Sequence, residues 1–236
     1  MRTLISTKFL FKKSLKPIII FYAILFTVLG LLFIPEVEQD SNSNIEMTAS
    51  IFLFAIGLNF YKEEFKFGLV NGCSRKTIFS AGILSLLSLA GLMAVVDTLT
   101  TKVMMALFDY KPMIERIYNR NYGTITGMLE GFLWAFAIYS LVAVTGYFIT
   151  ILYYRMNKLM KVVVSVGIPL LFMMVLPYLD SYLDGVIYRT IWNFILRVFG
   201  LYNTVNPYIA IASFFGGVII FSGLSFLLAR RAPIKD

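Results

Sequence analysis

Few side chains of this sequence could do chemistry inside apolar surroundings. Glu130 is a carboxylate well inside a long apolar run, and Arg189 and Arg197 share one stripe of a second apolar segment with Asn193. Ionisable groups in hydrocarbon are costly and usually face a polar interior or a transport pathway. These residues therefore predict contacts along a path through a membrane. The alternatives are an interfacial carboxylate for Glu130 and a surface helix without a transport role for the arginines.

Other kinds of site are excluded by composition. The sequence has no histidine, which rules out Ser-His catalysis, His-dependent proteolysis and His-ligated metal sites. Its single cysteine, Cys73, has no partner for an intrachain disulfide. No G-x-x-x-x-G-K-[ST] loop is present to bind nucleotide phosphates. We expect no catalytic residue, metal or cofactor on this chain, and no nucleic-acid partner.

The composition is that of a membrane protein. Apolar residues make up 59% of the 236 residues and charged residues only 14%, and the mean hydropathy is +0.80. The apolar runs are long and continuous, unlike the short alternating segments of a barrel. The sequence therefore predicts an all-α integral membrane protein with one domain over 1–236. Its six expected spans are about 17–34, 46–61, 77–99, 124–153, 161–179 and 207–229.

The basic residues predict the orientation of these spans, because short cytoplasmic loops retain Lys and Arg. With six spans, one side collects 15 of the 21 basic residues, and both termini lie in the cytoplasm. A five-span arrangement would separate Arg155 from Arg230, which fits less well. The opposite side receives an acidic loop that includes Glu46. The residues on the basic side are Arg2, Lys8, Lys12, Lys13, Lys16, Lys62, Lys66, Arg75, Lys76, Arg155, Lys158, Lys161, Arg230, Arg231 and Lys235.

The N-terminal segment combines basic and apolar residues. Leu4, Ile5 and Phe9 lie near Lys8 and Lys12, which suits an amphipathic helix at an anionic membrane surface. A basic tail that only fixes topology is the alternative. No small-x-small cleavage site follows the first apolar stretch, so we expect an uncleaved span.

The stretch FKFGLVNGCSRKTIF joins the second and third expected spans. Phe65 and Leu69 lie one turn apart on one face of a short helix, and Gly72 suits a left-handed helix end. Ser74 suits the N-cap of the next helix. Arg75, in the first turn, opposes that helix's dipole, so a role beyond helix stability is indicated.

With the residues EEFKFGLVNGCSRKTIF, the sequence resembles the type 2 ABC transporter permeases of Gram-positive bacteria. The resemblance implies an N-terminal interfacial helix, six spans, a cytoplasmic coupling helix between spans two and three, and an outer amphipathic helix between spans five and six. It further implies two copies of a separate ABC ATPase, which carries ATP and Mg, and a second permease, the same or related. The implied ATPase-coupling residues are Glu63, Glu64, Phe65, Lys66, Leu69, Gly72, Ser74 and Arg75. The alternative is a joint that only fixes topology.

Two further patterns lie inside the spans. Gly123, Gly127 and Gly131 recur every four residues and predict a close helix contact. Pro169 and Pro177 each remove a backbone donor and predict a bent fifth span that lines a cavity. By contrast, Asp97, Asp180 and Asp184 lie near expected span ends, and we expect them to be solvated caps or loop residues.

The resulting hypothesis is the permease subunit of an ABC exporter in a bacterial plasma membrane. The resemblance points to hydrophobic or amphipathic peptides, including toxins and antimicrobial peptides, as substrates. The alternative function is a membrane assembly or partner-binding protein that needs no ATPase. Such a protein would share the same topology and basic inner face.

Overall fold

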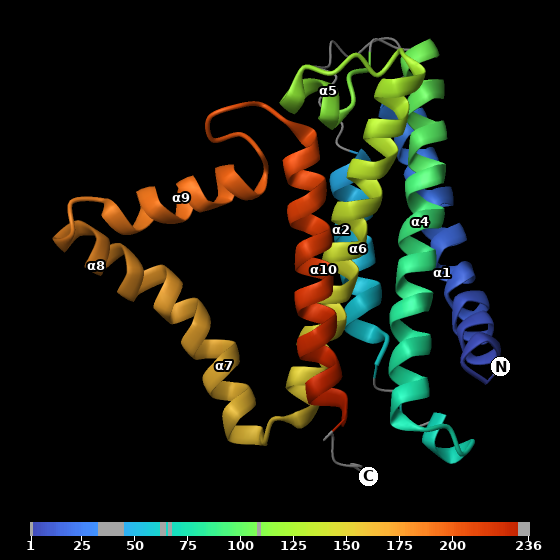
Figure 1. Ribbon diagram of the computed structural model, residues 1–236, viewed down its shortest axis with the longest axis vertical. Helices are drawn as coiled ribbons and strands as arrows, with labels where there is room; N and C mark the ends of the chain where they lie inside the picture. Colours follow the sequence, from blue (N-terminus) through green and yellow to red (C-terminus); the bar gives the residue numbers. More distant parts are fainter. Residues whose placement is uncertain (1, 33–44, 62–64, 66–67, 108–109, 231–236) are drawn as a thin grey trace.

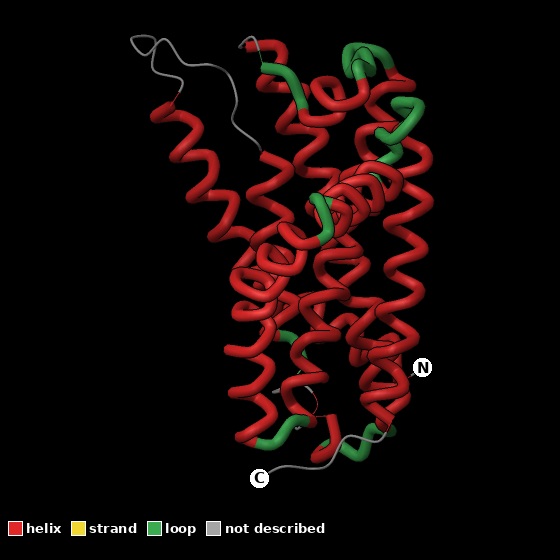
Figure 2. Tube along the Cα trace, turned by 90° about the vertical axis from the view of Figure 1, so that its left-hand side faces the viewer, coloured by secondary structure: helices red, strands yellow, loops and turns green. Residues whose placement is uncertain are grey.

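The regular structure of the chain is helical throughout the part described. The computed structural model describes residues 2–32, 45–61, 65, 68–107 and 110–230. Figure 2 shows helices and connecting loops in these ranges, and no strand. The helices are α1 (Arg2–Leu32), α2 (Ile45–Asn59), α4 (Arg75–Leu107), α5 (Met113–Tyr118), α6 (Ile125–Arg155), α7 (Lys158–Leu170), the π-helix η1 (Leu171–Val175), α8 (Leu176–Tyr182), α9 (Val186–Val198) and α10 (Pro207–Arg230).

Several of these helices are long and apolar enough to cross a membrane. Among the described residues there are five such segments, and α2 is a shorter apolar helix. The 15 residues of α2 rise only about 22 Å, less than a hydrocarbon core of about 30 Å. The chain therefore has the helices of a multi-pass membrane protein. The five segments are Ser6–Gly30, Arg75–Leu107, Ile125–Arg155, Lys158–Tyr182 and Pro207–Arg230.

The long helices of the bundle run in two opposite directions. Figure 1 shows α4 rising from the lower end of the bundle, α6 descending beside it, and α10 descending on the far side of α6. Helices α2, α4 and α10 all pack on α6, and α1 packs on α4. Because α4 is antiparallel to α6 and α10, the start of α4 and the ends of α6 and α10 meet at one end of the bundle. We call this the basic end; it carries Arg75, Lys76, Arg155, Lys158 and Arg230.

The N-terminal region differs from the expected pair of an interfacial helix and a separate span. It forms the single helix α1, and Pro17 lies inside it without ending it. A proline removes one hydrogen bond and can bend a helix whose remaining bonds stay intact. Leu10 and Ile18, on either side of Pro17, are both buried, so core contacts hold the two halves of α1 in one helix.

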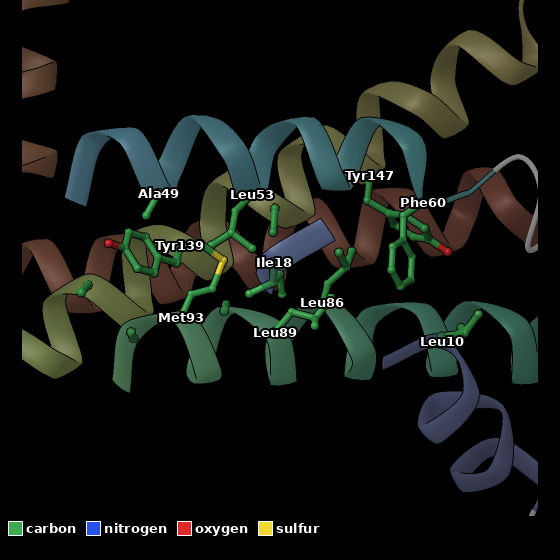
Figure 3. Packing of buried hydrophobic residues seen from close by; sticks show 14 of the residues in the cluster. Leu10, Ile18, Ala49, Leu53, Phe60, Leu86, Leu89, Met93, Tyr139 and Tyr147 are labelled. Carbon is green, nitrogen blue, oxygen red and sulfur yellow. The ribbon is translucent and has the colours of Figure 1, made fainter. Parts of the chain in front are cut away.

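The core lies between α1, α2, α4 and α6. Figure 3 shows Leu53 of α2 and Met93 of α4 pointing into the space between these two helices, with Tyr139 beside them. All three side chains are buried, as are Leu86 and Leu89 on the same stretch of α4. Interdigitated aliphatic and aromatic side chains of this kind stabilise the bundle through dispersion contacts between the helices.

Glycines bring α2 and α6 into backbone contact. A Cβ added to Gly57 would lie 2.2 Å from the Ala143 carbonyl oxygen, and one added to Gly146 would lie 2.5 Å from the Phe54 carbonyl oxygen. Real Cβ atoms do not approach backbone so closely, so any other residue would separate the helices. This pair of glycines permits the close helix contact typical of membrane bundles.

We expect Gly57→Ala to lower the free energy of unfolding by about 1–3 kcal/mol, because the added methyl group overpacks a rigid backbone contact. The matched control is Gly216→Ala in α10, where an added Cβ meets nothing within 4 Å. That change should raise stability by about 0.5–1 kcal/mol through helix propensity. Thermal unfolding of the detergent-solubilised protein measures both, and equal effects would contradict the backbone-contact argument.

The predicted glycine contact at 123, 127 and 131 is formed with a loop instead of another helix. Gly123 precedes α6, and Cβ atoms added at Gly127 and Gly131 would meet the Asn121 backbone and the Tyr122 ring. The loop before α6 folds back over its first turns because Thr124 caps the helix and accepts a hydrogen bond from the Gly127 amide at 3.1 Å. The glycine spacing thus makes room for Tyr122.

The segment 158–198, which we call the arm, stands away from the bundle. In Figure 1, α7 leaves the lower end, α8 lies at the far tip, and α9 returns toward the upper end of α10. None of the most apolar window of Lys158–Tyr182 is buried within the chain. Pro169 and Pro177 flank η1, which interrupts the α-helical hydrogen bonding. The two prolines therefore border a turn of π-helix within the arm.

Candidate functional site

Asp97 is the centre of a buried polar cluster, which corrects the expectation that it is solvated. Its carboxylate accepts a hydrogen bond from the Tyr22 hydroxyl at 2.8 Å and another from the Tyr139 hydroxyl at 2.5 Å. Only 2% of the residue is exposed. The three side chains come from α1, α4 and α6, so the cluster ties three helices together. The two hydroxyl donors satisfy a carboxylate that would otherwise be costly to bury.

Glu46 forms a second buried carboxylate at the start of α2. The sequence places it in an outer acidic loop, whereas the structure leaves it only 8% exposed. It accepts a hydrogen bond from the Tyr110 hydroxyl at 3.3 Å and from the Met113 amide at 3.2 Å. The carboxylate therefore holds the α4–α5 connection against the start of α2.

A small polar cavity lies between the two carboxylates. Its volume is about 10 Å³, and Glu46, Asp97, Thr98, Thr101 and Tyr122 contribute to its wall. This space is that of about one water molecule. Burial raises the pKa of the Tyr122 phenol to about 12, so the hydroxyl keeps its proton at neutral pH. The cavity can hold one water molecule, and it is too small for an organic substrate.

An apolar groove opens on the other side of Glu46. It has a volume of about 370 Å³ and is bounded by α2, α6, the start of α5 and the end of α9. Met47, Ile51 and Phe54 line its α2 wall, and Trp134 and Ile138 line its α6 wall. Apolar pockets with a few placed polar groups are typical binding sites for small ligands and apolar segments. The groove is the described cavity best suited to an amphipathic ligand.

Glu130 lies at the same end of the bundle as these carboxylates. It accepts a hydrogen bond from the Tyr208 hydroxyl at 2.5 Å and lies 3.7 Å from the Arg120 guanidinium. Glu130 therefore forms an ion pair with an arginine of the connection before α6. Helices α6 and α10 are linked through Tyr208, so Glu130 fastens the first turns of these helices.

The arginines of α9 lie on the exposed arm. Arg189 and Arg197 are both exposed, and the Arg197 guanidinium lies 4.5 Å from the centre of the Tyr202 ring. Asp180 is buried instead of solvated, and its carboxylate accepts hydrogen bonds from the Ile187 and Tyr188 amides at 2.8 and 3.1 Å, at the start of α9. The structure thus places neither arginine beside Glu130.

The joint before α4 has the predicted backbone. Gly72 adopts a φ of +69°, in the left-handed region. The Ser74 hydroxyl accepts a hydrogen bond from the Thr77 amide at 3.2 Å, as an N-cap does. Arg75 donates from Nη1 to the Arg230 carbonyl oxygen at 3.1 Å and so links the start of α4 to the end of α10. Glu63, Glu64 and Lys66 lie outside the described residues.

Phe65 is part of the core and cannot be a docking residue. Only 1% of it is exposed, and its ring lies 5.0 Å from the Tyr61 ring and 5.9 Å from the Tyr154 ring. Val70 is 87% exposed, and Leu69 is partly buried against the core. In the joint, Phe65 and Leu69 therefore pack on the core and Val70 is exposed. The sequence, by contrast, predicted Phe65 and Leu69 as contacts for an ATPase.

The burial of Asp97 and Glu46 had at most a weak signal in the sequence. Apolar residues follow Asp97 at Leu99 and again from Val103 to Leu107, which indicates that the third span extends beyond 99. Glu46 precedes an apolar run directly and had no comparable signal. Among the described residues, no group of three or more His, Cys, Asp or Glu side chains could hold a metal ion.

Comparisons of the chain with protein-family models, curated proteins and solved structures found no match. The family resemblance of the sequence therefore stays a prediction, and the function must be argued from the geometry of the chain itself.

Proposed function

We propose that this chain is the membrane-spanning permease subunit of an ATP-driven exporter whose ATPase is a separate chain. Two ATPase copies and a second permease, the same or related, complete the assembly in a bacterial plasma membrane. Its substrates are hydrophobic or amphipathic peptides. ATP and Mg bind the ATPase. This chain supplies the transport path and couples ATP hydrolysis to movement of the substrate.

The joint at the basic end is the observation that carries this proposal. Phe65 anchors the joint in an aromatic cluster with Tyr61 and Tyr154, while Val70 protrudes from its outer side. A partner that pushes on Val70 would act on an element fixed to α4 through the turn at Gly72 and to α6 through Tyr154. Such a rigid, partly exposed element is suited to transmit a conformational change from a cytoplasmic partner.

The groove beside Glu46 supports the choice of substrate class. Its walls are apolar, and a carboxylate lies at its edge, so it suits a ligand with an apolar face and a cationic group. In this proposal the groove is half of the path. A second permease facing this groove would complete the enclosure.

A membrane assembly or partner-binding protein is the second candidate. The apolar helix Lys158–Tyr182 favours it, since none of the most apolar window of that helix is buried within the chain. A partner helix could cover this surface without any ATPase. Identification of the co-purifying proteins separates the two candidates.

The test replaces Val70 with glutamate and measures ATPase retention. The full chain, tagged at its C-terminus, is purified from native membranes in mild detergent after crosslinking. We expect a stoichiometric ATPase with the unaltered chain and about tenfold less with Val70→Glu, since a central apolar contact contributes on the order of 1–2 kcal/mol. The matched control is Ile125→Glu, which alters a side chain 80% exposed at the opposite end of the bundle.

The control should retain the ATPase fully. Absence of any ATPase from the unaltered chain would reject the exporter proposal and favour the assembly protein. Equal loss with both variants would reject the docking role of the joint.

A further inference from the structure

A cavity at the basic end lies between the start of α4 and the end of α10. Its volume is about 280 Å³. Its wall consists of Ser74, Arg75, Lys76, Phe79, Phe226, Ala229 and Arg230. The cavity is far from the groove beside Glu46, at the opposite end of the bundle, and the proposed export function makes no use of it.

The rim of this cavity is cationic. Arg75, Lys76 and Arg230 contribute three positive charges, and among the described residues no acidic side chain lines the cavity. Arg75 uses Nη1 to bind the Arg230 carbonyl oxygen, which fixes one guanidinium of the rim in place. A guanidinium has five donors, so this contact leaves capacity for an oxyanion.

The placement of Arg75 and Lys76 is unfavourable for the isolated chain. Both are in the first turn of α4, where the helix dipole disfavours positive charge. These charges and that of Arg230 also repel one another around one cavity. A bound anion would relieve both effects, because it would interact favourably with the helix dipole as well as the side chains.

The floor of the cavity is apolar. The rings of Phe79 and Phe226 lie 5.4 Å apart with an angle of 57° between their planes, and both residues are partly exposed. Ala229 closes the floor behind them. A free phosphate ion would gain nothing from these rings, whereas an acyl chain would bury apolar surface against them.

We propose that this cavity binds one anionic phospholipid from the adjacent membrane leaflet. The lipid phosphate lies at Arg75, Lys76 and Arg230, and the start of an acyl chain lies on Phe79 and Phe226. Basic pockets between membrane helices are the expected sites for anionic headgroups. The lipid adds to the Arg75–Arg230 hydrogen bond and the Phe79–Phe226 ring contact, which already join α4 to α10 at this end of the bundle.

The proposal is tested by titrating the delipidated full chain with phosphatidylglycerol in detergent and counting bound lipids by native mass spectrometry. We expect one tight phosphatidylglycerol and at least tenfold weaker binding of phosphatidylcholine. The double variant Lys76→Gln, Arg230→Gln should weaken phosphatidylglycerol binding about tenfold or more, since two charge-assisted contacts are lost. Arg75 is kept, because its contact with α10 is structural.

The matched control is Lys158→Gln, Lys161→Gln, which removes two charges from the same end of the chain outside the cavity wall. This control should bind phosphatidylglycerol as the unaltered chain does. Equal weakening in both double variants would overturn the site and leave only a general surface charge effect.

Two further measurements identify the ligand. Phe226→Ala should weaken phosphatidylglycerol binding and leave binding of inorganic phosphate unchanged. Inorganic phosphate at millimolar concentration should not displace the lipid. Displacement by phosphate, or lipid binding unaffected by Phe226→Ala, would overturn the lipid assignment and identify a site for a free anion.

Discussion

Replacing Phe65 with alanine is expected to lower the free energy of unfolding by about 3–5 kcal/mol, the range for truncating a fully buried phenylalanine. The change removes a ring that is stacked on Tyr61 and meets the edge of Tyr154. The lost contacts join the joint before α4 to the end of α6. Thermal or denaturant unfolding in detergent, followed by intrinsic fluorescence, gives the magnitude.

The matched control for Phe65→Ala is Val70→Ala in the same joint. Val70 is almost fully exposed, so its truncation should change stability by less than about 0.5 kcal/mol. Nearly equal stabilities of the two variants would show that Phe65 is not anchored in the core.

Asp97→Ala is expected to lower the free energy of unfolding by about 2–5 kcal/mol. Two hydroxyl groups, those of Tyr22 and Tyr139, lose their acceptor while they remain buried, and each orphaned group costs about 1–3 kcal/mol. The Tyr22 hydroxyl also lies 3.2 Å from the Met93 carbonyl oxygen, which can accept its hydrogen bond in part. The larger share of the loss should therefore come from Tyr139.

A second substitution separates this mechanism from a simple cavity effect. Adding Tyr139→Phe to Asp97→Ala removes the orphaned donor, and the double variant should be more stable than Asp97→Ala alone. Asp97→Asn keeps one acceptor oxygen and should have a smaller effect than Asp97→Ala. A double variant less stable than Asp97→Ala would contradict the hydrogen-bond account. Unfolding in detergent at neutral pH measures all three.

The sequence by itself determined the class of the fold and much of the local geometry. Long apolar runs can satisfy their backbone in a membrane only as helices, and the chain has helices at each expected position. Local rules also located the left-handed Gly72 and the Ser74 cap. These features depend on a few neighbouring residues, so they can be read without knowledge of the tertiary structure.

The tertiary structure alone decided which side chains are buried and what they contact. The spans are apolar on every side, so no periodic pattern marks the face that packs inward. Asp97 and Glu46 therefore looked like residues at exposed helix ends, and Phe65 looked available to a partner. Their burial depends on tyrosines distant in the sequence, such as Tyr139 and Tyr154, which reach them only when α6 lies at the centre of the bundle.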